Sequence, residues 1–102
     1  MPRILRATNE LTAYFVLELQ RVTQDRPMSD PQYDRSIESF VNYHVNDGFS
    51  YEDLKALRKA HVTHGTMNRS INEGRGELTG DDLFRLGTFY GILEGILRSK
   101  TE

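Results

Sequence analysis

The middle of the chain carries side chains of the kinds that recognise DNA bases. In the major groove, asparagine can form two hydrogen bonds to adenine, and arginine can form two to guanine. If Met67 and Ile71 anchor a short helix to the core, five polar residues point outward: His64, Thr66, Asn68, Arg69 and Asn72. Lys55, Lys59 and Arg75 flank them and suit phosphates, which position a protein on DNA without reading its sequence. These residue types predict a surface that binds double-stranded DNA.

The charge pattern can be interpreted in two ways. The formal net charge is −2, which by itself does not favour a nucleic-acid partner. Its distribution is uneven: residues 27–53 hold six acidic and one basic residue, whereas residues 54–76 hold five basic and one acidic residue. The basic segment also contains His61 and His64. This contrast is either ordinary surface variation or an electrostatic footprint confined to one element, as in many nucleic-acid-binding proteins.

Other kinds of chemistry receive less support from the sequence. His61 and His64 are three residues apart and could share one helix face with a metal ion, but the chain has no cysteine and no third ligand nearby. Residues 73–76 are glycine-rich yet lack the lysine and the preceding strand of a phosphate-binding loop. Asp81 and Asp82 lie where a helix N-terminus favours acidic groups. We therefore expect a binding protein without catalytic residues, metal or cofactor, and not an enzyme.

The elements that must position these residues are helices. Apolar residues recur at helical spacing, and no segment alternates as a strand would. The expected helices cover residues 9–24, 31–46, 51–61 and 63–72, followed by a helical region that starts near residue 80. Their expected N-terminal caps are Thr8, Asp30, Ser50, Thr63 and Thr79. The predicted fold is all-α, a compact bundle of five to six short helices in one domain, with residues 1–30 as N-terminal helix and linker and residues 31–98 as the core.

Residues 48–97 carry a family resemblance. The segment GFSYEDL at 48–54 looks like a turn and the capped start of a helix, and VTHGTMNR at 62–69 looks like a turn followed by a recognition helix. Residues 72–74 resemble a closing loop, and residues 83–92 resemble the packed helix that follows it. This order resembles the phage-repressor-like (Xre/Cro-type) helix-turn-helix domain, related to lambda repressor. The resemblance implies a dimeric transcriptional regulator, of the size common in phages, plasmids and bacteria, that reads the major groove with residues 63–72.

The match departs from the family pattern around the turn. His61 stands where glycine is usual, Leu57 is near a position that usually holds a small side chain, and Ser70 replaces an apolar anchor. The alternative interpretation is one continuous helix over residues 50–72 with no turn.

Three glycines follow one another at four-residue intervals near the C-terminus. Gly87, Gly91 and Gly95 would each cost about 1 kcal/mol relative to alanine inside a helix, or roughly 3 kcal/mol together. Small residues at this spacing allow two helices to approach closely. We therefore expect these glycines and Tyr90 to form the interface of a two-fold homodimer. The alternative is that one helix ends at Gly91 and a short new one follows.

Length and composition leave a second class of function open. With 102 residues, no cysteine, no signal peptide and no apolar run long enough for a membrane span, we expect a soluble cytoplasmic domain. The rival function is a small protein-binding module, such as an inhibitor, adaptor or anti-defence factor. In that case the acidic segment 30–53 or the apolar C-terminal helix would contact the partner. A purely structural oligomer is a third possibility.

Overall fold

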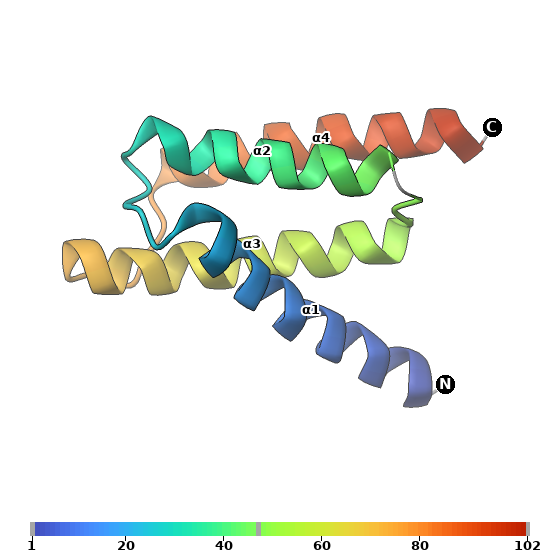
Figure 1. Cartoon of the computed structure of the whole chain (residues 1–102), viewed down its shortest axis with the longest axis horizontal. Coiled ribbons are helices and arrows are strands. Elements are labelled where there is room, and N and C mark those ends of the chain that lie inside the picture. Colours follow the sequence, from blue (N-terminus) through green and yellow to red (C-terminus); the bar gives the residue numbers. More distant parts are fainter. Residues whose placement is uncertain (1, 47, 102) are drawn as a thin grey trace.

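The computed structural model describes the backbone of residues 2–46 and 48–101 and the side chains of residues 10–44 and 48–99. Within these ranges the chain forms four helices and no strand: α1 (Pro2–Thr23), α2 (Pro31–Asn46), α3 (Tyr51–Glu73) and α4 (Gly80–Thr101). In Figure 1, α2 and α4 run along the same side of the molecule, α3 lies beneath them, and α1 crosses α3 obliquely. The predicted all-α class is confirmed, but five to six helices are not found, because the expected turn near residue 62 and the alternative break at Gly91 are both absent.

The first absent break is the turn expected between two helices near residue 62. The helix α3 is continuous, and its buried side recurs at three- and four-residue steps through Leu54, Leu57, His61, His64 and Asn68. A turn would shift the phase of this stripe, and no shift occurs. The expected cap Thr63 lies inside the helix, where its hydroxyl donates to the carbonyl of Lys59 at 3.0 Å. The continuous-helix interpretation is therefore the one that the structure shows, and the turn is not present.

The second absent break concerns α4, which continues through Gly87, Gly91 and Gly95 as a 22-residue helix. The alternative of a helix end at Gly91 is thus wrong. The first helix also differs from the prediction, because it begins at Pro2 and places the expected cap Thr8 within its second turn.

The remaining helix ends follow the sequence prediction. Ser50 and Asp53 form a capping box: the Ser50 hydroxyl accepts from the Asp53 N–H at 3.1 Å, and the Asp53 carboxylate accepts from the Ser50 N–H at 2.9 Å. Thr79 and Asp82 repeat this arrangement before α4, at 3.1 and 3.0 Å. Asp30 accepts from the N–H of Gln32 at 2.9 Å at the start of α2. Such caps satisfy backbone N–H groups that have no partner within the helix.

A common apolar core joins the helices. Most of its members lie at helical spacing on one side of each helix: Phe15 and Leu19 of α1; Tyr33, Ile37, Phe40 and Val41 of α2; Leu54, Leu57 and Ala60 of α3; and Leu86, Tyr90, Leu93 and Leu97 of α4. The α1 helix packs mainly on α3 and also on α2, whereas α4 packs on α3. Among the described residues, no helix combines the length and the hydropathy that a membrane crossing requires.

Candidate functional site

The structure reverses the orientation predicted for the DNA-reading residues. His64, Asn68 and Arg69 are buried, with 2, 3 and 9% of their surface exposed. The expected anchors point outward instead, since Met67 is 38% and Ile71 is 74% exposed. The prediction that those three polar side chains face solvent is therefore wrong, because α3 continues without a turn and keeps them on its buried side.

The other predicted contact residues are accessible but do not form one surface with the buried three. Thr66 is half-buried and its hydroxyl donates to the carbonyl of Val62 at 2.9 Å. Asn72 is exposed and its side-chain amide donates to the carbonyl of Asn68 at 3.1 Å. Lys55, Lys59 and Arg75 are exposed at opposite ends of α3. The residues predicted to read bases and those predicted to bind phosphates therefore do not lie on one common surface.

Two tyrosine–histidine pairs connect α3 to the helices above it. The Tyr33 hydroxyl of α2 lies 3.0 Å from Nδ1 of His64, and the two rings stack. The Tyr90 hydroxyl of α4 lies 2.9 Å from Nδ1 of His61. Burial lowers the pKa of both histidines, that of His61 to about 3, with the neighbouring His64 and Arg85 adding to the effect. Both histidines are therefore neutral at pH 7, and they do not share a face open to a metal ion.

Arg69 and Asp82 form a buried ion pair between α3 and α4. Arg69 donates through Nε to Asp82 at 2.8 Å and pairs with it through a terminal nitrogen at 2.7 Å. Arg69 also pairs with Glu73 at 2.5 Å. Burial alone would raise the pKa of Asp82, but hydrogen bonds from Thr79 and the charge of Arg69 hold that pKa below its ordinary value. The arginine predicted to read guanine therefore fixes the start of α4.

Asn68 fixes the linker between α1 and α2. Its amide donates to the carbonyl of Arg26 at 2.7 Å, and its side-chain oxygen accepts from the N–H of Met28 at 3.2 Å. These bonds satisfy two backbone groups that lie outside any helix. The sequence contained one indication of this role, because residues 61, 64 and 68 continue the spacing of the apolar stripe at 54 and 57.

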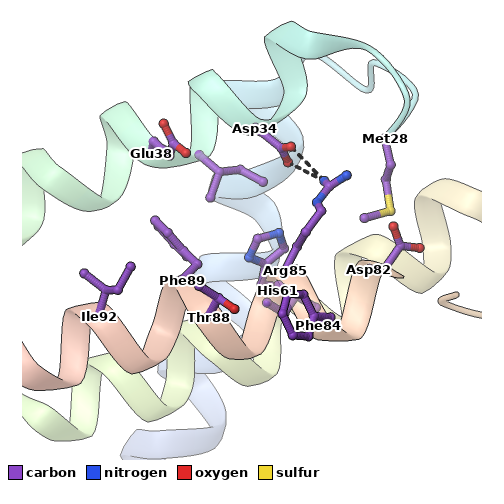
Figure 2. Close-up of a pocket in the computed structure, with 12 residues that line it drawn as sticks. Met28, Asp34, Glu38, His61, Asp82, Phe84, Arg85, Thr88, Phe89 and Ile92 are labelled. Atoms are coloured by element: carbon purple, nitrogen blue, oxygen red, sulfur yellow. Dashed lines mark hydrogen bonds and ion pairs between the residues drawn. The ribbon is translucent and has the colours of Figure 1, made fainter. Parts of the chain in front are cut away.

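A groove lies between α2 and α4. Its volume is about 390 Å³, and His61 of α3 lies at its base. Figure 2 shows Arg85 reaching from α4 to Asp34 on α2 at one end, with Glu38 on α2 and Phe89 and Ile92 on α4 further along. The two Arg85–Asp34 contacts measure 2.7 and 2.9 Å. The α4 wall combines the apolar side chains of Phe84, Phe89 and Ile92 with Arg85 and Thr88, and the α2 wall carries the carboxylates of Asp34 and Glu38.

Apolar side chains on α4 remain exposed beside this groove. Phe84 is 75% and Ile92 is 60% exposed, and both line the groove. Gly87, Gly91 and Gly95 are also exposed, and a Cβ placed on any of them would meet no atom within 4 Å. Tyr90, which we expected at the same interface, is only 1% exposed and belongs to the core. The prediction for Tyr90 is therefore wrong, because its ring points to the opposite side of α4.

No group of three histidine, cysteine or carboxylate side chains that could hold a metal ion occurs in the part of the chain that the structure describes. Comparison with known proteins found no matching family model, no matching curated protein and no matching solved structure.

Proposed function

We propose that this protein is a protein-binding module that captures a helix of its partner in the groove between α2 and α4. The observation that carries the proposal is the exposure of Phe84 and Ile92 on one wall of a preformed apolar groove. Large apolar side chains gathered at one place on a surface are typical of protein interaction sites. A second helix laid along such a groove would cover both side chains.

The geometry of the groove favours an amphipathic helix as the occupant. Helix-in-groove recognition uses apolar anchors of the incoming helix at three- and four-residue intervals. Here the anchors would contact Phe84, Phe89 and Ile92 of α4, which all line the groove. The length of the occupant would run parallel to α2 and α4, which extend side by side in Figure 1.

The charge of the α2 wall favours a basic edge on that helix. Asp34 is already paired with Arg85, whereas Glu38 is exposed one turn further along α2. A lysine or arginine at the matching turn of the partner helix would therefore form an ion pair with Glu38. Charge complementarity of this kind contributes more to specificity and association rate than to affinity.

The test is a selection from displayed helical peptides, followed by binding titrations with variants of the groove. Ile92→Ser removes an exposed anchor, and Ile71→Ser removes an equally exposed isoleucine at the far end of α3. We expect selected peptides to bind Ile92→Ser at least tenfold more weakly and Ile71→Ser as well as the unchanged protein. Glu38→Arg should disfavour basic peptides, and Glu77→Arg, the same charge change in a loop outside the groove, should not. Equal binding to Ile92→Ser and the unchanged protein would refute the assignment.

Binding to DNA is the second candidate, and one observation supports it. Lys55, Arg58 and Lys59 are exposed on successive turns of α3 and would suit phosphate contacts without base reading. Retention on duplex DNA that falls steeply with salt, and is lost in the double variant Lys55→Glu with Lys59→Glu, would establish it. Absence of retention at low salt would leave protein binding as the function.

A further inference from the structure

We propose that two copies of this chain pair through the outward faces of α4, running antiparallel, so that Phe84 of each copy lies on Gly95 of the other. Phe84 and Thr88 also line the groove, so this self-association shares part of the α4 wall with the captured helix, whereas capture alone requires the α2 wall.

The helix α4 carries two seams with the same spacing on opposite sides. Leu86, Tyr90, Leu93 and Leu97 follow a four-three-four spacing and are buried against the rest of the fold. Phe84, Thr88, Gly91 and Gly95 follow the same four-three-four spacing, and all four are exposed. This is the spacing with which helices pair along a seam. The inner seam is buried within the chain, whereas the outer seam is exposed to solvent, with Phe84 and Thr88 at the edge of the groove.

The glycines of the outer seam have no packing role within the chain. A Cβ at Gly87, Gly91 or Gly95 would meet nothing within 4 Å, so alanine would fit and would favour the helix. Gly65 of α3 is different, because its Cβ would lie 3.1 Å from the side chain of Leu78. The open glycines on α4 instead provide room for another backbone to approach.

The unequal sizes of the side chains along the outer seam favour an antiparallel arrangement of the second copy. In a parallel pair, Phe84 would face Phe84 and Gly95 would face Gly95, which crowds one end and leaves a gap at the other. In the antiparallel register with Phe84 on Gly95, Thr88 lies on Gly91, and the two-fold axis repeats both contacts. Each large side chain then meets a glycine, and the exposed ring of Phe84 is covered.

The charged residues beside the seam agree with the same register. Asp81 and Arg98 continue the three- and four-residue spacing of the outer seam at its two ends, and with Phe84 level with Gly95 of the second copy, Asp81 is level with Arg98. A parallel pair would instead set each of these two residues level with its own like charge. Opposite charges at matching levels favour association, and like charges disfavour it. Charge and side-chain size thus point to one occupant, a second copy of this chain.

The register can be tested by cross-linking, because the chain contains no cysteine. At a rise of 1.5 Å per residue, two copies of position 88 are offset by about 4.5 Å along the antiparallel pair, whereas two copies of position 99 are offset by about 28 Å. A short bis-maleimide should therefore join Thr88→Cys into a dimer and leave Ser99→Cys monomeric. Cross-linking at both positions would indicate a parallel pair and overturn the proposal. Failure at Thr88→Cys would overturn it as well.

Sedimentation equilibrium gives an independent test. Gly91→Leu adds a side chain where the single chain has open space, so the fold should persist, but the second helix can no longer approach. We expect at least tenfold weaker association than for the unchanged protein. Thr63→Leu, a matched change at an exposed helical position of α3, should leave association unchanged. A strictly monomeric protein at high concentration, or association that Gly91→Leu does not weaken, would refute the pairing.

Discussion

Acid should destabilise this fold well before its carboxylates titrate, because His61 must stay neutral to remain where it is. The ring is buried, its Nδ1 is 2.9 Å from the Tyr90 hydroxyl, and its pKa is lowered to about 3. In the unfolded chain the pKa returns to its ordinary value of 6.5. Below pH 6.5 His61 therefore binds a proton in the unfolded state, whereas in the folded state it stays neutral until the pH approaches 3. The contribution of His61 to stability is complete above pH 6.5 and is lost as the pH falls towards 3.

The magnitude follows from the two pKa values. Each pH unit between them changes the free energy of unfolding by about 1.4 kcal/mol, so lowering the pH from 7 to 5 should remove about 2 kcal/mol. For a domain of this size, that loss corresponds to a fall in Tm of roughly 8–16 °C. His64, whose pKa is also lowered by burial, acts in the same direction.

Thermal unfolding followed by circular dichroism between pH 8 and pH 4 measures this fall. In His61→Gln the amide can still hydrogen-bond Tyr90 but does not titrate, so the variant should be less stable at pH 7 and should lose less stability between pH 7 and 5. A Tm that is constant from pH 7 to 5, or an equal slope in His61→Gln and the unchanged protein, would refute the reasoning.

Three further predictions concern stability. Arg69→Ala should lower the free energy of unfolding in urea by about 3 kcal/mol, because it leaves the buried carboxylate of Asp82 without its ion partner. Asn68→Ala should cost about 2 kcal/mol in the same assay, since two backbone groups of the α1–α2 linker lose their bonds. Gly91→Ala should raise the stability of the dilute monomer by about 1 kcal/mol. Gly65→Ala should stabilise the protein less, because a Cβ at position 65 would meet neighbouring side chains and a Cβ at position 91 would not.

These three predictions can fail in different ways. Arg69→Ala with unchanged stability would show that the pair with Asp82 is replaced by water. Stability unchanged in Asn68→Ala would mean that the linker finds other partners. A loss in Gly91→Ala at low protein concentration would contradict the open space on the outer face of α4.

Helix ends could be predicted from the sequence because their chemistry is local. Ser50, Thr79 and Asp30 each bond to a backbone group two or three residues away, so the residues that decide the cap are adjacent in the chain. The all-α class followed for the same reason, since helical spacing is a property of short windows.

The inner side of α3 could not be predicted in this way, because its partners are distant in sequence. His64 is satisfied by Tyr33 from 31 residues away, and Asn68 by the carbonyl of Arg26 from 42 residues away. With those partners unknown, the polar side chains were assigned to solvent and Met67 and Ile71 to the core. The assumption that polar residues face outward thus produced the wrong phase for the second half of α3.

The distribution of side chains with and without interaction partners within the fold bears on the function of the protein. Among the described residues, every buried side-chain nitrogen and oxygen has a hydrogen-bond partner, so the polar side chains best suited to chemistry are engaged in holding α1, α2 and α4 onto α3. The exposed side chains include large apolar ones, among them Phe84 and Ile92 on α4, and Gly87 and Gly91 between these two leave the backbone open. Burial of such surface is favourable by about 25 cal/mol per Å². This exposed apolar surface is the physical basis of the association through α4 that we propose.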